Sequence, residues 1–235
     1  AQTVYEGLPW KSLASELDAV LSGAYSVSLF TYWTSDLIDQ VWVKRIEGSN
    51  SIEYFGARAA DGPRHPLPDM PEKNCTEQMG VPGPAHQRLP HFRMEFTPSG
   101  GEELQAEYIL PREHAFAALS EIDAIREKIA PLLYVSEIRT VAADELWLSP
   151  SYGRDSVCIH FTWRQMVPEV TALLPEIEAR LAPFGARPHW GKLFDMRAER
   201  VRTLYPKVGE FEGLVRTYDP SGKFGNAFLR QRILG

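Results

Sequence analysis

Segments in which polar and apolar residues alternate constrain the fold of this chain most, because they come in adjacent pairs. In a β-strand successive side chains point to opposite faces, so alternation indicates a strand with one buried face. Residues 24–33 (AYSVSLFTYW) and 41–47 (VWVKRIE) have this pattern and could be antiparallel neighbours. The chain also reads as strand at 91–96 and 104–110, around the turn TPSGGE, and at 132–141 and 156–163.

Longer segments with helical periodicity lie before and between these pairs. Residues 9–22 carry an apolar face; Pro9 suits the first turn of a helix and Gly23 its end. Residues 112–131 and 168–185 have similar spacing, with Pro175 expected to kink the second helix or begin a new turn. Adjacent strand pairs with helices between them predict an α+β fold, in which helices cover one side of a large, mostly antiparallel sheet.

Residues 56–92 differ from the rest of the chain because prolines recur through them. The prolines are Pro63, Pro66, Pro68, Pro71, Pro82, Pro84 and Pro90. Such a segment is too rich in proline for a helix or a central strand, and too apolar and varied for a plain disordered linker. We therefore predict a long ordered loop, a kind of segment that is usually functional.

Charge and motif content exclude several functions. There are 25 Lys and Arg residues against 31 Asp and Glu, a net charge of −6, so we expect no nucleic-acid partner. Neither a long apolar run nor a signal-peptide pattern occurs, so we expect a soluble, cytoplasmic protein without a membrane partner. Cys75 and Cys158 lack zinc-ligand spacing; we expect two buried free thiols rather than a disulfide, and no metal site.

Four polar residues in two of the predicted strands are candidates for a site. Glu137 and Arg139 are two apart in SEIRT, and His160 and Thr162 are two apart in CIHFTW. Each pair therefore shares one face of its strand, and if the strands are neighbours all four side chains meet. Glu and Arg together suit the vicinal hydroxyls of a polyhydroxylated ligand. Spacing alone equally allows an ordinary ion pair on a solvent-exposed face, and a structural histidine.

Lys192 is a further candidate, in the segment RPHWGK at 187–192. The lysine follows a Trp-Gly turn, and the preceding proline restrains the backbone. One interpretation is a surface lysine on a turn. The other is a lysine held beside an electron-rich cofactor, and spacing does not decide between them.

Several segments resemble the alditol (xylitol) oxidases of the vanillyl-alcohol-oxidase superfamily. RPHWGK resembles the HWxK motif that sugar-acid lactone and polyol oxidases share, and DPSGKFGNAFL resembles their closing DPxGxFxN signature. AYSVSLFTYW, QVWVKR, the long block from NCTEQMGVPGP to LQAEY, SEIRTVAADELWLSPSYGRDSV and HFTW follow the order of the alditol oxidases. The resemblance extends over residues 24–229 and is specific because so many blocks occur in order.

The resemblance implies an FAD enzyme that oxidises the terminal hydroxyl of an alditol, such as xylitol or sorbitol, to an aldehyde, while O2 is reduced to hydrogen peroxide. It implies that Glu137, Arg139, His160, Thr162 and Lys192 line the polyol pocket. Glu137, His160 and Thr162 would bind hydroxyls, and Arg139 and Lys192 would place positive charge near the substrate oxygen and the flavin ring. Arg139, Lys192 and His160 are thus the catalytic candidates, with Lys192 contacting the cofactor. His160 is the natural proton acceptor by pKa.

These oxidases carry an N-terminal FAD domain that the 235 residues do not contain. We therefore expect residues 1–215 to form the substrate-binding cap domain of FAD-linked oxidases, and residues 216–235 to be a C-terminal segment that returns to the FAD domain. The chain would then be a fragment or a split gene product, inactive alone, with a wide exposed apolar patch. The alternatives are a fragment of a sugar-acid lactone oxidase and a stand-alone polyol- or sugar-binding module.

Overall fold

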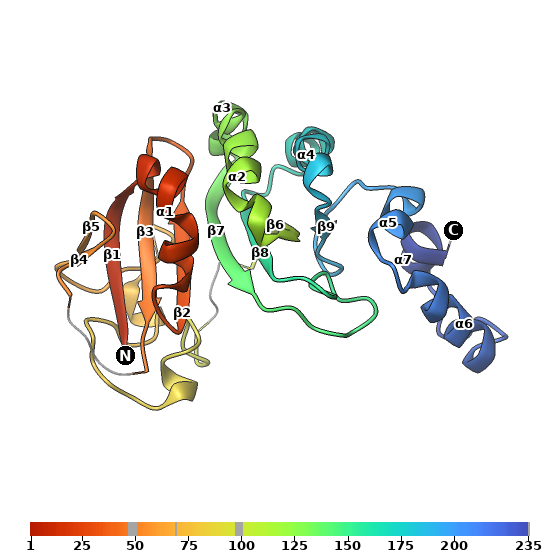
Figure 1. Cartoon of the computed structure of the whole chain (residues 1–235), viewed down its shortest axis with the longest axis horizontal. Coiled ribbons are helices and arrows are strands. Elements are labelled where there is room, and N and C mark those ends of the chain that lie inside the picture. Colours follow the sequence, from red (N-terminus) through yellow and green to blue (C-terminus); the bar gives the residue numbers. More distant parts are fainter. Residues whose placement is uncertain (47–50, 69, 97–100, 235) are drawn as a thin grey trace.

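A computed structural model describes residues 1–46, 51–68, 70–96 and 101–234 (Figure 1). Its strands form one sheet, in the order β4-β5-β1-β3-β2-β7-β8-β6-β9, and every neighbouring pair is antiparallel. The strands are β1 Gln2–Pro9, β2 Ser26–Thr31, β3 Leu37–Lys44, β4 Glu53–Tyr54, β5 Ala57–Ala59, β6 Leu104–Pro111, β7 Leu133–Val141, β8 Ser156–Trp163 and β9 Arg187–Pro188.

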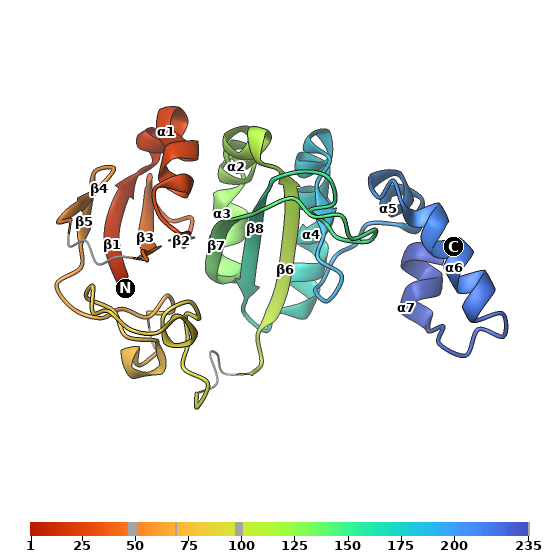
Figure 2. The same ribbon diagram turned by 60° about the horizontal axis from the view of Figure 1, so that its bottom comes forward.

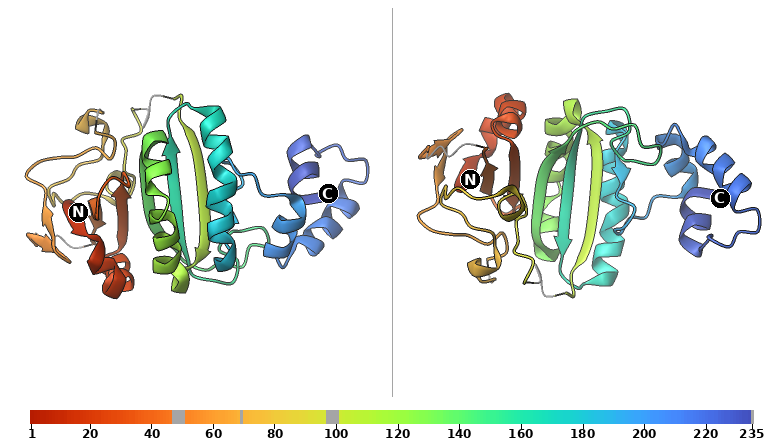
Figure 3. Two further views of the ribbon diagram at one scale, coloured as in Figure 1. Left: turned by 90° about the horizontal axis from the view of Figure 1, so that it is seen from above. Right: turned by 90° about the horizontal axis from the view of Figure 1, so that it is seen from below.

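Helices α1 to α4 cover one face of this sheet, which confirms the predicted α+β fold. The helices are α1 Trp10–Ser22, α2 Ala115–Asp123, α3 Arg126–Ile129, α4 Val167–Leu181, α5 Ala198–Leu204, α6 Val208–Tyr218 and α7 Ala227–Leu229. Apolar side chains of α1 to α4 pack against the sheet in one continuous core. Figure 3 shows the green and blue-green helices α2 to α4 on one side of the strands. We call this side the helix face. No helix among the residues that the structure describes is long and apolar enough to cross a membrane.

The opposite face of the sheet has two halves. Over β1, β3 and β2 it is apolar, with Val4, Phe30 and Trp42 packed beneath Cys75 and Phe92 of the proline-rich segment. That segment forms only short elements besides β5, including the 3-10 turns Glu72–Asn74 and Ala85–Gln87, in keeping with the predicted ordered loop. Over β7, β8 and β6 the same face carries charged side chains, and we call this half the polar face.

Most predicted strands are confirmed, but 91–96 is wrong. Instead of pairing with β6, this segment runs beside residues 74–76, with a single bridge between Cys75 and Phe92. The Thr76 N–H donates to the His91 carbonyl at 2.9 Å, and the Arg93 N–H donates to the Asn74 carbonyl at 2.9 Å. The proline-rich segment thus supplies the backbone partners that a neighbouring strand would have supplied. Glu47 and residues 97–100, within the predicted strand and turn, lie outside the described residues.

The other differences concern where elements begin and end. The strand predicted from residue 41 already begins at Leu37, and β1 at Gln2–Pro9 was not predicted at all. The helix predicted at 112–131 is broken between α2 and α3, where the Ile125 N–H donates to the carbonyl three residues back, at 3.0 Å. This tightened turn keeps Ile125 buried in the core. Pro175, by contrast, lies within a single helix, α4.

The C-terminal helices lie at the end of the molecule farthest from the N-terminus (Figure 2). Helix α6 has no buried residue. Arg232 ties the tail back to the rest of the chain, because its Nη1 donates to the carbonyls of Asp195 and Met196 at 2.9 and 2.8 Å. The predicted boundary at residue 215 falls inside α6 and stays a prediction.

Candidate substrate site on the polar face

Strand register brings the predicted residues of β7 and β8 together. The two strands are antiparallel neighbours, and Glu137 lies directly opposite His160. Arg139 and Thr162 lie on the same face but on opposite sides of this pair, since Arg139 lies opposite Cys158 and Thr162 lies opposite Val135. Ile138 and Ile159 point the other way and are fully buried in the core of the helix face. The alternation of polar and apolar residues therefore fixes which side chains share the polar face.

A buried carboxylate on the neighbouring strand β6 joins the two predicted cations. Glu107 is 2% exposed and lies opposite His160 from the other side. Its Oε1 accepts a hydrogen bond from Arg139 Nη2 at 2.7 Å, and its Oε2 accepts one from Lys192 Nζ. Arg139 Nη1 donates to Glu137 Oε2 at 2.8 Å. The result is a chain of alternating charges across three strands, Glu137–Arg139–Glu107–Lys192.

The turn that carries Lys192 is held against β6 by backbone hydrogen bonds. The N–H of His189 donates to the Glu107 carbonyl at 2.9 Å, and the N–H of Leu193 donates to the Gln105 carbonyl at 2.8 Å. Trp190 anchors the turn from outside, since its indole N–H donates to the Leu148 carbonyl at 2.8 Å. The HWGK segment thus fixes the backbone from which Lys192 reaches Glu107.

The proline-rich segment adds a histidine to the same cluster. Nε2 of His91 lies 3.1 Å from Oε1 of Glu137, and Nδ1 of His91 lies 3.1 Å from Nζ of Lys44 on β3. These groups border a hollow of about 190 Å³ that Glu137 and Arg139 also line. The hollow opens on the edge of the polar face nearest β2.

Burial and charge together set the protonation of the cluster. Burial alone would raise the pKa of Glu137, but the hydrogen bond with His91 and the charge of Arg139 outweigh it and hold that pKa well below its usual range. Burial likewise opposes ionisation of Glu107, yet Arg139 and Lys192 lower its pKa. Both carboxylates are therefore ionised at neutral pH. Both carboxylates are buried, whereas the Arg139 side chain that joins them is 37% exposed.

His160 is the neutral member of the cluster. Burial, with the positive charge of Lys192, lowers its pKa to about 4. Its Nε2 is buried and has no hydrogen-bond partner among the described residues. A neutral imidazole can accept a proton or a hydrogen bond from a hydroxyl group. The arrangement thus offers an acceptor next to two fixed cations and two carboxylates, a set that suits a neutral ligand with several hydroxyls.

The pKa of His160 predicts how stability depends on pH. The unfolded chain binds a proton at this residue below about pH 6.5, whereas the folded chain resists protonation until about pH 4. Stability is therefore complete above pH 6.5 and falls as the pH drops toward 4, by up to about 3 kcal/mol for this residue. Urea unfolding of wild type and His160→Gln at intervals from pH 7.5 to 4 measures the effect. Equal pH slopes for the two proteins would contradict the assignment.

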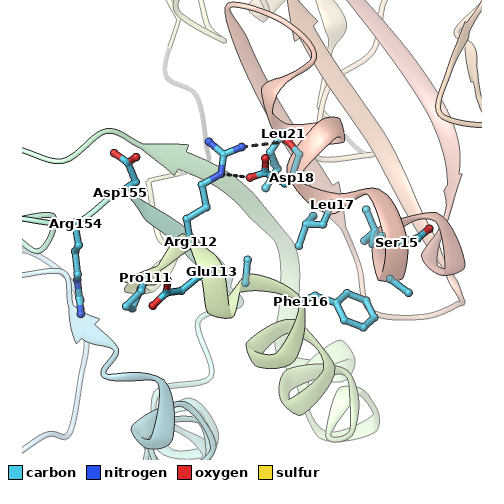
Figure 4. A pocket seen from close by; sticks show the side chains of 13 residues that line it. Ser15, Leu17, Asp18, Leu21, Pro111, Arg112, Glu113, Phe116, Arg154 and Asp155 are labelled. Atoms are coloured by element: carbon cyan, nitrogen blue, oxygen red, sulfur yellow. Dashed lines mark hydrogen bonds and ion pairs between the residues drawn. The ribbon is translucent and has the colours of Figure 1, made fainter.

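A larger hollow lies on the helix face, away from the cluster. Its volume is about 640 Å³, and it runs between α1 and the start of α2 (Figure 4). Figure 4 shows Arg112 reaching across it to Asp18, and the Nε–Oδ1 distance is 2.7 Å. None of the predicted site residues lines this hollow. We place the candidate site on the polar face because the predicted residues and the unpartnered imidazole nitrogen converge there.

Sequence reasoning missed three residues of the cluster, Glu107, His91 and Lys44. A signal for Glu107 existed, since a lone carboxylate within the apolar run AEYIL needs a buried partner. His91 and Lys44 gave no such signal, because their contact depends on how the proline-rich segment folds back over the sheet.

Comparison with known proteins establishes the family. The model of a family described as D-arabinono-1,4-lactone oxidase matches residues 102–232, which include β6 to β9 and every predicted site residue. The chain belongs to this family. Within it, the chain is similar to an alditol oxidase from a Streptomyces species, strain IKD472, at 49% identity over 234 residues, which cover 100% of this chain and 56% of that protein.

Two lactone-acting proteins are more distant relatives. An L-gulono-1,4-lactone dehydrogenase of Mycobacterium tuberculosis is 33% identical over 132 residues, which cover 56% of this chain and 30% of that protein. An L-gulonolactone oxidase of Mus musculus is 29% identical over 131 residues, 53% of this chain and 30% of that protein. The chain thus spans about half the length of the alditol oxidase that it matches along its whole length.

Proposed function

We propose that the chain is the substrate-binding part of an FAD-dependent alditol oxidase. The observation that carries the proposal is the cluster in which Glu137 and Arg139 lie beside a neutral His160, whose buried Nε2 has no hydrogen-bond partner in the described part of the chain. Such a set binds vicinal hydroxyls without requiring a charged ligand. The 49% identity to an alditol oxidase over the whole chain supports a polyol such as xylitol or sorbitol.

In this proposal each polar side chain has a defined task. Glu137 accepts a hydrogen bond from a substrate hydroxyl, and Thr162 and His160 bind the hydroxyls next to it. His160 Nε2 is also the candidate acceptor of the proton from the hydroxyl that is oxidised. Arg139 and Lys192 fix positive charge beside the oxygen on which negative charge develops. The terminal carbon then becomes an aldehyde.

We propose that the polar face meets the ring end of a flavin, and that the rest of the cofactor lies outside this face. The flavin supplies the hydride acceptor and the link to O2, which is reduced to hydrogen peroxide. Reduced flavin carries negative charge, and Lys192 and the 37%-exposed Arg139 would stabilise that charge. The sequence has no GxGxxG segment that would hold a diphosphate. We therefore propose that a separate FAD domain binds most of the cofactor.

The C-terminal helices support a contact with such a domain. Tyr218 is 79% exposed and Phe224 is 74% exposed. Both border an apolar hollow of about 330 Å³ that α6 and the following segment line. We propose that residues 1–215 form the substrate-binding domain and that residues 216–235, with the exposed side of α6, contact the FAD domain. A cytoplasmic setting is also part of the proposal, supported by two free, buried cysteines.

Visible absorption spectra test whether this chain or a separate FAD domain binds the flavin. We expect the purified chain to retain no flavin absorbance after FAD is added and unbound FAD removed, because its sequence has no GxGxxG segment to hold the diphosphate. Retained flavin would overturn the proposal that a separate FAD domain binds most of the cofactor. Co-expression with the FAD domain of an alditol oxidase should then yield a yellow complex that forms hydrogen peroxide from xylitol.

A lactone oxidase is the second candidate, and the family description and the lactone-acting relatives favour it. The same complex distinguishes the two. Peroxide formed from xylitol and sorbitol but not from L-gulono-1,4-lactone supports the alditol oxidase, and the reverse supports the lactone oxidase. A stand-alone binding module would bind polyol without either turnover, and the flavin-directed Lys192 would then have no task.

A further inference from the structure

Glu107 is the one member of the charge chain that touches both cations. Its carboxylate is 2% exposed, and each oxygen is committed to a different partner, Arg139 or Lys192. The position of Glu107 on β6 is fixed by paired strands on both sides, β8 and β9. A rigid strand thus presents one carboxylate to two long, flexible cationic side chains.

Long cationic side chains do not hold one position without a partner. Lys192 has a flexible stem of four carbons, and the Lys192 amine would otherwise sample many rotamers. Arg139 is held at Nη1 by Glu137 as well, so that Glu107 completes a two-sided clamp around its guanidinium. Lys192 has no carboxylate partner other than Glu107 among the described residues. Removing Glu107 would therefore release the lysine far more than the arginine.

We propose that Glu107 is the positioning residue of the site, which holds the Lys192 amine and the Arg139 guanidinium at a fixed separation. Its effect on catalysis rests on the proposed function, whereas its hold on Lys192 does not. Glu107 acts through these cations and has no task as an acid or base. It also compensates their charge, since Glu107 and Glu137 together balance Arg139 and Lys192.

The first test measures Lys192 directly in the full chain. Reductive methylation followed by peptide mass spectrometry reports how accessible the amine is, and Lys192 is now 15% exposed. In Glu107→Gln the methylation rate of Lys192 should rise roughly tenfold, the factor that corresponds to one lost charge-assisted hydrogen bond. Glu178→Gln is the matched control. Glu178 is a carboxylate of the helix face that accepts hydrogen bonds from Tyr108 and the Asp195 N–H, and Gln can accept both.

Glu107→Asp keeps the charge but withdraws the carboxylate by one methylene, so it should give an intermediate rate. Circular dichroism shows whether Glu107→Gln folds. If it does not, the methylation rate of Lys192 in Glu107→Asp alone tests the proposal. If Glu107→Gln folds and its Lys192 is methylated at the wild-type rate, the proposal is overturned. If Glu107→Gln does not fold, a wild-type methylation rate of Lys192 in Glu107→Asp overturns it.

The second test uses the complex with the FAD domain. Glu107→Gln should lower kcat for xylitol about 100-fold, the effect of misplacing a catalytic group by about 1 Å, with a smaller change in KM. Glu107→Asp should restore part of the loss, and Glu178→Gln should keep wild-type kinetics. If wild type does not oxidise polyols, the proposed function fails, while the methylation result still decides whether Glu107 positions Lys192. A wild-type kcat in Glu107→Gln would remove the catalytic half of the proposal.

Discussion

Replacing Lys192 with methionine should lower kcat for xylitol about 100- to 1000-fold in the complex with the FAD domain, while KM changes much less. This size is typical of removing one preorganised electrostatic partner of a developing charge. In the proposed site that charge develops as the hydride leaves the terminal carbon, so the lysine acts mainly on the transition state. A loss of that kind appears in kcat rather than in KM.

Methionine keeps the unbranched stem of the side chain without the amine, and the fold should survive because Glu107 retains Arg139 as its partner. Lys192→Arg should recover part of kcat through its charge. Lys128→Met is the matched control, since Lys128 is exposed on the helix face and pairs with Glu176 there. Steady-state peroxide assays on the four proteins measure the effect. A Lys192→Met enzyme within threefold of wild-type kcat would show that the lysine is a structural partner of Glu107 and nothing more.

The strands and helices were predictable where one periodicity covers a whole element. β8 shows this most clearly, because the strand predicted at 156–163 occupies Ser156–Trp163. Its alternation of polar and apolar residues also placed His160 and Thr162 on the same face as Glu137 once β7 became its neighbour. The alternation in these two adjacent strands thus made the shared face of the site residues predictable. The role of these residues in catalysis stays a prediction.

Contacts that depend on a distant segment were not predictable in the same way. The segment at 91–96 has the composition of a strand, yet its backbone groups bond to residues 74–76, which only the folded loop brings near. This misassignment hid His91, which contacts Glu137. Glu107 was hidden for another reason. Its partners Arg139 and Lys192 lie 32 and 85 residues away, and local patterns do not record such pairings.

Replacing Phe161 with alanine should destabilise the chain by about 3–5 kcal/mol, the range found when a fully buried phenylalanine is truncated. Phe161 is fully buried in β8 between His160 and Thr162, and its ring stacks on Trp163 with 4.9 Å between centroids. For a domain of this size the loss corresponds to a fall of roughly 10 °C in Tm. Urea unfolding at pH 7.5 gives the free energy, and thermal scans give Tm.

Phe161→Leu should cost much less because leucine refills most of the space, and Phe224→Ala should cost almost nothing because that ring is exposed. A loss below about 1 kcal/mol for Phe161→Ala would mean that the core beneath β8 collapses around the missing ring. The polar face would then rest on a strand free to shift, and the fixed separation of His160, Glu107 and Glu137 would lose its physical basis. A loss of about 3–5 kcal/mol would instead show that the core beneath β8 does not collapse around the missing ring, so that the strand carrying His160 and Thr162 rests on rigid packing.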